Sequence, residues 1–540
     1  MRSSRALRNL HAVSRRPAHG IAPRIQNLRK SYCTVCDEAI VKPAKAKKLP
    51  KTSDQLVKPP ADHRQLGIDQ ELFTTSIYSP GSPLFLPNGT KIFNKLTGFL
   101  RAQYDLFGFE EVITPTIYKK SLWEKSGHWE NYAEDMYSVT GRGASGEGEG
   151  KQIGEDEEYG LKPMNCPGHC LLFASKKRSY KDLPIRFADF SPLHRNEVSG
   201  SLSGLTRVRR FHQDDGHIFC RPSQIGEEIS KTLQFIKMSY EILRLGSYRL
   251  TLSTRPESHY IGTIEEWDNA ENALKESLNA SGEAWTINEG DGAFYGPKID
   301  IILKDSDGKE HQTATIQLDF QLPKRFELEY TAPAPELEAM GKTTEDRALN
   351  DVEGPVTPVL IHRAVLGSVE RIMALLIEHY NGRWPFWLHP RQIILLPISN
   401  TKPFLDYTEN LKNTLQGRAL NPTPAGPNSM PWLPSQMSMN NRLSIDIDAE
   451  GKSLGKRIST AKRKGYAVIV VVGNESLEHD KVSCDLSGIS DPKNHLLDHL
   501  HSTTNQVAEG MPASAENLKQ IKMGPNSLRE FLVSLQNGYF

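Results

Sequence analysis

The chain has 540 residues, which is too long for one ordinary domain and predicts two or three. Its 38% hydrophobic and 24% charged residues are typical of a globular protein with some disordered segments, and no apolar run approaches the ~20 residues that span a bilayer. The net charge of +1 argues neither for nor against a polyanionic partner, so the distribution of charge matters more than its sum. Six cysteines, at positions 33, 36, 166, 170, 220 and 484, are too few and too scattered for a disulfide framework and indicate a reducing compartment.

The N-terminal segment is strongly basic. Eight Lys or Arg residues occur within its first 30 positions, and no acidic residue precedes Asp37. An Arg-rich, Ser-containing, acid-free segment without an apolar core is typical of a mitochondrial presequence, which we expect over residues 1–36 together with localisation in the mitochondrial matrix. A basic arm that touches RNA is the alternative. Residues 37–61 are predicted to be a Lys/Pro-rich linker, and Cys33-x-x-Cys36 lacks a second cysteine pair, so we interpret that spacing as chance.

Folded structure is expected from Asp62 onward. Apolar residues at helical spacing predict a helix over residues 90–103, and residues 107–115 are predicted to form a strand that ends at a proline. Residues 141–160 are rich in glycine and acidic residues, which indicates a disordered insertion. The next segment, MNCPGHC, contains Pro167 at a position suited to the first turn of a helix.

Residues 195–220 concentrate polar side chains at alternate positions. The pattern on either side of a central Ser/Gly-rich turn predicts two strands. Because successive side chains of a strand point to opposite faces, one face of the second strand is expected to carry Arg209, Phe211, Gln213, Asp215 and His217. His212 and Asp214 take the other face, and Arg195 and Glu197 share a face at the end of the first strand. So much polarity on one surface predicts a substrate pocket, with an exposed polar hairpin as the alternative.

Helices and strands alternate through the next part of the chain. Residues 225–245 are predicted to be helical, and three later segments are predicted to be strands: 293–300, 315–320 and 359–365. A further helix is expected to begin after Ser368, a plausible N-cap, and to stop at Asn381-Gly382.

Composition changes after Pro390, where a separate small α/β domain is predicted. Its expected strands alternate with helical stretches and occupy residues 393–397, 443–447 and 466–472. A Pro/Ser/Met-rich insertion covers about 421–440. A basic stretch at 452–464 precedes the last clear strand and is interpreted either as a solvated helix face or as a phosphate contact.

Five segments together identify a family that the chain resembles. MNCPGHC, RNEVSGSLSGLTRVRRFHQDDGHIF, FYGPKID, TIQLDF and HRAVLGSVER occur in the order found in the threonyl-tRNA synthetases, which are class II aminoacyl-tRNA synthetases. The resemblance covers residues 62–390 as the catalytic domain and 391–540 as the anticodon-binding domain. It implies an α/β (α+β) fold with an antiparallel sheet flanked by helices, followed by a small C-terminal α/β domain. The three class II motifs fall on the strand ending at Pro115, on the central hairpin, and on the helix at 367–380.

The resemblance implies ATP-dependent attachment of threonine to tRNA(Thr) through a threonyl-adenylate, for mitochondrial translation. It also implies Mg²⁺ bound with ATP, a homodimer built around the region of Pro115, and no membrane insertion. Longer members carry an N-terminal editing domain, whereas only a leader and a linker precede Asp62 here, as in the mitochondrial enzyme of fungi. Two alternatives remain: a class II synthetase for another amino acid, such as serine or proline, and a synthetase-like RNA-binding regulator without catalysis.

The resemblance assigns a zinc site to Cys166, His217 and His362. Thiolate and imidazole suit zinc, and three protein ligands leave a fourth position open, as in catalytic zinc sites. Spacing alone leaves Cys170, His169 and His212 as further candidates, although the strand alternation favours His217 over His212.

The other roles also follow from the resemblance. Arg195 and Arg371 are expected to act catalytically on the ATP phosphates, Arg207 to reach the outer phosphates, and Glu197 to accept from the adenine amino group. Threonine is expected to contact Asp215, with three supporting residues, Gln213, Tyr295 and Gln317, of which Gln317 also contributes to the ATP site. Lys298 is expected to be a third catalytic residue, near the substrate or a phosphate.

Overall fold

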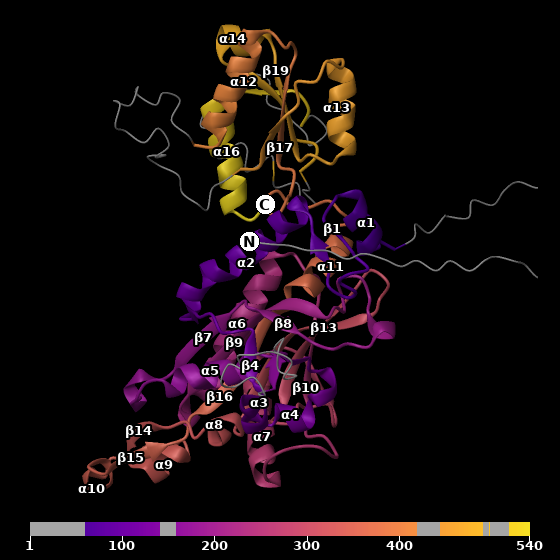
Figure 1. The fold of residues 1–540 in the computed structure, drawn as a ribbon. Helices are drawn as coiled ribbons and strands as arrows, with labels where there is room; N and C mark the ends of the chain where they lie inside the picture. The colour runs from indigo at the N-terminus through magenta and orange to yellow at the C-terminus, as the bar shows by residue number, and fades with distance from the viewer. Residues whose placement is uncertain (1–59, 141–157, 418–442, 490–495, 497–517) are drawn as a thin grey trace, which may run out of the picture. The chain divides into compact units, whose positions relative to one another are not determined.

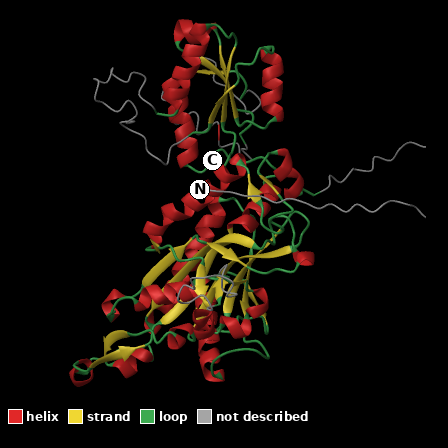
Figure 2. Cartoon of the chain, viewed as in Figure 1, coloured by secondary structure: helices red, strands yellow, loops and turns green. Residues whose placement is uncertain are grey.

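The computed structural model describes residues 60–140, 158–417, 443–489, 496 and 518–540 (Figures 1 and 2). The predicted presequence, nearly all of the linker, the insertion at 421–440 and residues 141–157 of the other insertion lie outside the described residues. No helix in the described ranges is long and apolar enough to cross a membrane.

The large sheet of the chain has nine strands. Their order is β11-β10-β12-β13-β16-β9-β7-β3, and β8 pairs with β9 off this path. Neighbouring strands are antiparallel except for two parallel edge pairs, β10 with β11 and β3 with β7. The bounds are β3 (Glu110–Glu111), β7 (Ile185–Asp189), β8 (Pro192–His194), β9 (Arg210–Cys220), β10 (Arg249–Ser253), β11 (Trp285–Asn288), β12 (Lys298–Lys304), β13 (Glu310–Asp319) and β16 (Val359–Ser368).

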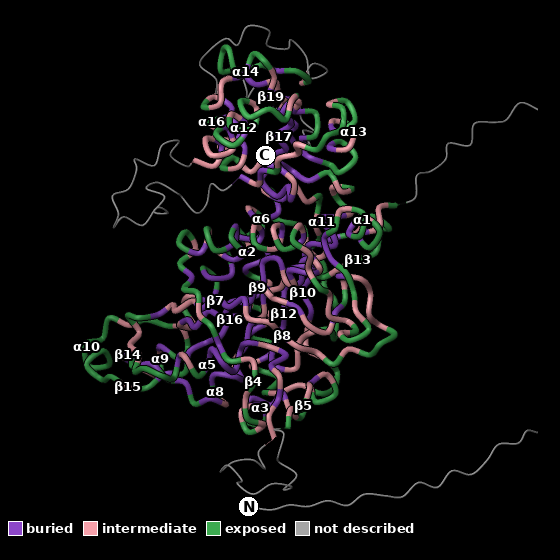
Figure 3. Tube along the Cα trace, turned by 45° about the horizontal axis from the view of Figure 1, so that its top comes forward, coloured by how far each residue is buried: buried purple, intermediate pink, exposed green. Residues whose placement is uncertain are grey.

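Four long helices supply most of the apolar side chains that pack against this sheet. They are α2 (Pro87–Phe107), α6 (Ile225–Ile242), α7 (Ile264–Ser281) and α11 (Val369–His379). Their buried faces join the sheet residues in one continuous core, which includes Ile92, Phe235, Leu274 and Met373. Figure 3 shows the central strands as buried. The predicted fold class, an antiparallel-rich sheet flanked by helices, is therefore confirmed.

Short elements complete this part of the chain. They are α1 (His63–Asp69), β1 (Phe73–Thr74), β2 (Leu84–Phe85), β4 (Ile117–Lys119), α3 (Lys120–Ser126), α4 (His128–Asn131), β5 (Ser138–Val139), β6 (Tyr159–Leu161), α5 (Cys166–Ala174), α8 (Leu322–Arg325), β14 (Tyr330–Pro333), α9 (Pro335–Ala339), α10 (Arg347–Asn350) and β15 (Glu353–Val356).

The predicted helix boundaries agree with the caps that the structure shows. Pro167 occupies the first turn of α5. The Ser368 side chain accepts a hydrogen bond from the Arg371 backbone N–H at 3.2 Å, which caps α11 as predicted. Asn381 and Gly382 then follow the helix with positive φ angles of 46° and 69°, a conformation that ends a helix.

The structure corrects three strand predictions. The predicted strand at 107–115 is only the two-residue β3, because Phe107 completes α2 and Gly108 ends that helix in the left-handed region (φ 71°). The predicted strand at 293–300 begins only at Lys298, since the chain turns at 293–296. The first strand of the central hairpin ends at His194, so the connection to β9 is longer than predicted. In addition, Tyr159 and Gly160 belong to β6 and not to an insertion.

The C-terminal part forms a five-stranded sheet in the order β18-β17-β19-β20-β21. Its strands are β17 (Ile393–Pro397), β18 (Ile445–Ile447), β19 (Val468–Val472), β20 (Val482–Asp485) and β21 (Ile521–Met523), and its helices are α12 (Lys402–Leu415), α13 (Leu454–Arg463), α14 (Asn474–His479) and α16 (Pro525–Asn537). The three predicted strands are present. The basic stretch forms α13, and the strand after it is not the last, because β20 and β21 follow in antiparallel pairing.

Candidate active site

One cavity of about 360 Å³ is lined by every site residue that the sequence predicted. β9, β12, β13 and β16 supply side chains from the sheet, while α5, α11, the loop between β8 and β9 and the turn before β12 supply the rest. The residues brought together are Cys166, Arg195, Glu197, Arg207, Gln213, Asp215, His217, Tyr295, Lys298, Gln317, His362 and Arg371. Their individual roles stay predictions, but segments far apart in the sequence meet at one place.

The alternation predicted for the second strand of the hairpin holds in β9, except that Arg209, which was predicted on the same face, precedes the strand and does not line the cavity. Gln213, Asp215 and His217 line the cavity. On the other face, His212 Nδ1 lies 2.9 Å from Glu370 Oε1, and the buried Asp214 pairs with Arg363. This placement removes His212 from the candidate metal ligands.

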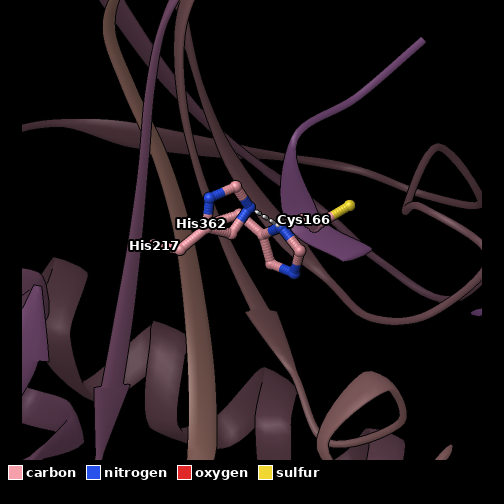
Figure 4. A group of neighbouring side chains, drawn as sticks. All are labelled: Cys166, His217 and His362. Atoms are coloured by element: carbon pink, nitrogen blue, oxygen red, sulfur yellow. Dashed lines mark hydrogen bonds between the residues drawn. The ribbon is translucent and has the colours of Figure 1, made fainter. Parts of the chain in front are cut away.

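Cys166, His217 and His362 form a compact buried group (Figure 4). His217 and His362 are paired across β9 and β16, and Cys166 is the first residue of α5. One potential ligand atom from each residue lies within 4.8 Å of the others, and none of the three residues is more than 5% exposed. The remaining candidates are not in this group, although the His169 ring packs edge-on against His217 at 4.6 Å.

The hydrogen-bond partners of the two imidazoles indicate where their nitrogen lone pairs lie. His362 Nε2 lies 2.9 Å from Asp319 Oδ2, and a carboxylate oxygen accepts, so the proton is on Nε2 and the lone pair on Nδ1. That Nδ1 faces His217 Nε2 at 2.9 Å. Within the described residues, His217 Nδ1 has no hydrogen-bond partner. Burial, followed by the neighbouring His169 and His362, lowers the pKa of His217 well below its usual value, so this imidazole is neutral.

The donor set fits a zinc ion. One thiol and two imidazoles, with a carboxylate behind one of them, are the ligand types of catalytic zinc sites that have three protein ligands and a fourth, open position. Burial raises the pKa of Cys166 well above its usual value, and a bound cation would reverse that preference by stabilising the thiolate.

Three arginines give the cavity a positive region. Arg371 donates from Nε to Thr206 O at 3.0 Å and from Nη1 to Gln312 O at 2.9 Å. Arg207 pairs with Glu197 at 2.7 Å, whereas Arg195 lies over the Phe211 ring. In the described parts of the chain, neither Arg195 nor Arg371 pairs with a carboxylate.

The pKa of Arg371 is lowered from its usual value. Burial lowers it first, and the nearby Arg195 and Arg207 lower it further. Such a cluster of cations is arranged to receive a polyanion.

A second polar group surrounds the two histidines. The Asn165 amide donates to Asp215 Oδ2 at 3.1 Å, and burial raises the pKa of Asp215. The Tyr295 hydroxyl donates to Gln317 Oε1 at 2.6 Å, and the Tyr295 ring stacks on His362 with centroids 5.0 Å apart.

Lys298 is engaged by carboxylates. Its Nζ lies 3.1 Å from Asp291 Oδ2 and 2.5 Å from Asp300 Oδ2. Its ammonium is therefore held in place at the cavity wall.

The sequence analysis missed His128 and Asn165. His128 is fully buried, and its Nε2 lies 3.7 Å from Cys166 Sγ. Burial, with smaller contributions from neighbouring cationic groups, lowers the pKa of His128 to about 3. Neither residue sits in an alternating strand pattern. Asn165 lies within the MNCPGHC segment, which is the signal that could have indicated it, whereas the sequence around His128 carries no such signal.

The fold and cavity define a class of protein. Residues 151–380 match the tRNA synthetase class II core domain (G, H, P, S and T), and residues 392–485 match the anticodon binding domain. Class II synthetases use Mg²⁺ with ATP.

Within that class, the chain belongs to the threonyl-tRNA synthetases. It is 50% identical over 438 residues to the probable mitochondrial threonine–tRNA ligase of Schizosaccharomyces pombe, covering 80% of this chain and 85% of that relative. It is 48% identical over 428 residues to the mitochondrial threonine–tRNA ligase of Saccharomyces cerevisiae, covering 76% and 83%. Among solved structures, a crystal structure titled as the RNA binding domain of threonyl-tRNA synthetase from Cryptosporidium parvum Iowa II matches with a TM-score of 0.65 and 42% identity, covering 79% of this chain and 92% of that one.

Proposed function

We propose that the cavity is where this chain, as a threonine–tRNA ligase, activates threonine with ATP and passes it to tRNA(Thr). The observation that carries the proposal is that one cavity contains both the arginine cluster and the Cys166/His217/His362 group. The first suits a triphosphate, and the second suits a small ligand with an amino group and a hydroxyl. The fungal relatives named mitochondrial place the activity in mitochondria, and the basic leader supports the matrix as its site.

The first step joins the threonine carboxylate to the α-phosphorus of ATP. A carboxylate oxygen forms a bond to phosphorus, and the bond to the pyrophosphate oxygen breaks. Since negative charge is spread over the phosphoryl oxygens throughout, fixed cations stabilise the transition state more than an acid or a base does. We assign this role to Arg195 and Arg371, with Arg207 on the outer phosphates and Lys298 near the substrate.

Adenine and threonine are positioned by the polar residues of the cavity. Glu197 accepts from the adenine amino group, and Gln317 contributes to both ligands. For threonine, Asp215 pairs with the amino group or the hydroxyl, supported by Gln213 and Tyr295.

Cys166, His217 and His362 are the residues that would hold zinc. When bound there, the ion supplies an open position that recognises the amino and hydroxyl groups of threonine together. Asp319 orients His362, because its Oδ1 is itself fixed by the backbone N–H groups of Gln321 and Leu322 at 2.7 and 3.1 Å.

In the second step, a hydroxyl of the terminal ribose of tRNA attacks the carbonyl carbon of the adenylate, and AMP leaves. The domain that matches the anticodon-binding family supports selection of tRNA(Thr). The seryl-type synthetase and the non-catalytic regulator are not favoured, because the relatives are threonine–tRNA ligases and both catalytic arginines are present.

Threonine-dependent exchange of labelled pyrophosphate into ATP tests the proposal. The purified chain is expected to exchange with threonine and not with proline. Exchange driven mainly by another amino acid would contradict the assignment of substrate, and no exchange with any amino acid would contradict catalysis.

We also propose a homodimer built around the segment that follows β3. Two apolar side chains there are exposed, Ile113 at 87% and Ile117 at 46%. Exposed apolar patches of this kind are typical of protein interfaces. Sedimentation equilibrium is expected to give twice the chain mass for the wild type, and Ile113→Asp is expected to shift the mass toward one chain. A monomeric wild type would contradict the proposal.

A further inference from the structure

His63 lies outside the cavity but connects two of the elements that form it. It is the first residue of α1 and is buried. Its Nδ1 lies 2.6 Å from Oε1 of Glu378, in the last turn of α11, the helix whose first turn carries Arg371. Its Nε2 lies 3.2 Å from the backbone N of Leu205, in the loop between β8 and β9. One imidazole thus contacts both the helix and the loop that supply the arginine cluster.

These two contacts fix the tautomer of the ring. A backbone N–H can only donate, so His63 Nε2 carries a lone pair and accepts from Leu205. The proton is then on Nδ1, where it donates to the Glu378 carboxylate. Gly204 makes the approach possible: its φ is +47°, and a Cβ at this position would lie 2.1 Å from His63 Nε2.

The loop that His63 holds leads directly into the cavity. Leu205 is fully buried. The carbonyl of the next residue, Thr206, accepts from Arg371 Nε at 3.0 Å, and Arg207 follows with its ion pair to Glu197. His63 and Arg371 therefore each hold a backbone group of the same short segment, one through an N–H and the other through a C=O.

A metal site does not explain this cluster. Ligand atoms of Asp62, His63 and Glu378 do lie within 4.8 Å of one another. However, the Asp62 carboxylate already accepts from the Arg64 guanidinium at 2.9 to 3.2 Å and from the Arg64 backbone N–H at 2.8 Å. Because the Arg64 guanidinium contacts both carboxylate oxygens of Asp62, Asp62 is already paired with a cation and does not need a metal ion.

We propose that His63 is a positioning residue for ATP: its neutral ring holds the Leu205–Arg207 segment so that Thr206 and Arg207 face the triphosphate. This inference rests on the function proposed for the cavity. His63 is thereby added to the residues that position ATP. It lies more than 130 positions before the loop, in a part of the chain outside the active-site motifs.

Two replacements of His63 separate its two contacts. The asparagine amide reaches the position of Nδ1 and can donate to Glu378, but it offers no acceptor to Leu205. The glutamine amide reaches the position of Nε2 and can accept from Leu205. Gly200→Ala is the matched control in the same loop, because a Cβ at Gly200 has nothing within 4 Å.

Pyrophosphate exchange with varied ATP and with varied threonine is the first measurement. His63→Asn is expected to raise the KM for ATP about tenfold, since a buried N–H loses its acceptor, and to leave the KM for threonine unchanged. His63→Gln is expected to stay within about threefold of the wild type, and Gly200→Ala to match it. Equal effects of the two His63 variants, or an equal rise in both KM values, would overturn the proposal.

Hydrogen exchange of the Leu205 amide is the second measurement, and it requires no activity. The amide is expected to exchange at least about tenfold faster in His63→Asn than in the wild type or in His63→Gln. An unchanged amide would overturn the role of His63, whereas a missing threonine-dependent activity of the wild type would overturn the proposed function instead. If His63→Asn does not fold, Gly204→Ala perturbs the same contact from the loop side, and it is expected to raise the KM for ATP and not that for threonine.

Discussion

Arg371→Ala is expected to remove most of the adenylate-forming activity and to leave the fold intact. The side chain is anchored through Nε and Nη1 to the carbonyls of Thr206 and Gln312. Within the described residues it has no carboxylate partner, so its removal leaves no buried negative charge unpaired. Burial and, after it, repulsion from Arg195 and Arg207 lower the pKa of Arg371, and the substitution removes that repulsion. The melting temperature is therefore expected to change by only about 1 °C, which is what about 1 kcal/mol produces in a chain of this size.

The size of the kinetic effect follows from the charge that is lost. A fixed donor aimed at developing negative charge is worth about 3 to 4 kcal/mol, or roughly 10²- to 10³-fold in kcat. Coulomb's law gives about 4 kcal/mol for two unit charges 4 Å apart at an effective dielectric constant of about 20, which agrees. Lysine keeps the charge but lacks the planar fork, so it cannot hold both carbonyls and still reach a phosphate oxygen. Arg371→Lys is therefore expected to have a kcat no more than about tenfold higher than that of Arg371→Ala.

Pyrophosphate exchange at saturating threonine, with ATP varied, measures these effects. Arg249→Ala is the control, because it removes an exposed arginine that pairs with Glu310 and does not line the cavity. Exposed ion pairs contribute little, so this variant is expected to stay within about twofold of the wild type. Near-normal exchange by Arg371→Lys, or a loss in Arg371→Ala no larger than in Arg249→Ala, would refute the reasoning.

The remaining predictions concern the metal and the amino acid. The purified protein is expected to carry about one zinc per chain, and Cys166→Ser or His362→Ala to lose zinc and threonine activation together. Metal analysis that finds full zinc in these variants would contradict the site. Asp319→Asn keeps all three ligands but removes the carboxylate behind His362. Chelator titration is therefore expected to show zinc binding about 10- to 100-fold weaker than in the wild type. Asp305→Asn, which removes the carboxylate next to His311, is the control. Valine is expected to be activated poorly, because it would leave the polar groups that bind the threonine hydroxyl unpaired. Serine lacks only a methyl group, so its rate of activation is expected to be about 10- to 200-fold below that of threonine. Exchange assays with the three amino acids check this, and equal rates with valine and serine would argue against recognition of the hydroxyl.

The period of two along β9 was predictable from the sequence, and it correctly placed three of the cavity-lining residues on one face of the strand. Side-chain alternation depends only on the local backbone, so Gln213, Asp215 and His217 could be assigned to one face without knowledge of the fold. The same argument correctly placed His212 and Asp214 on the other face.

Contacts between distant segments were not predictable in this way. Cys166 approaches His128 across 38 residues, and His63 contacts Glu378 across 315. No local periodicity encodes such pairs, because they depend on the order of strands in the sheet and on how α1 packs. The strand predicted at 107–115 failed for a local reason instead: Gly108 ends α2 in the left-handed region, which leaves only Glu110 and Glu111 to pair with β7.

The polar residues on both faces of β9 explain how the arginine cluster is built. A carboxylate on the core side of a strand would ordinarily destabilise it, yet Asp214 is fully buried. Its Oδ2 accepts from the backbone N–H groups of Val365 and Leu366 at 2.7 and 3.0 Å, and its Oδ1 pairs with Arg363, whose guanidinium lies 4.1 Å from the centre of the Phe109 ring.

These two N–H groups lie where the pairing of β16 with β9 shifts register, between Ala364 and Ser368. A register shift leaves backbone groups without strand partners, and Asp214 supplies the acceptor that they need. After the register shift the chain passes through Gly367 into the N-cap of α11. Gly367 has a φ of +63°, and a Cβ at this position would lie only 2.3 Å from Thr313 O. Asp214 faces away from the cavity, but it fixes the bend from which Ser368 and Arg371 reach the cavity wall. Both faces of β9 therefore contribute to the same cavity.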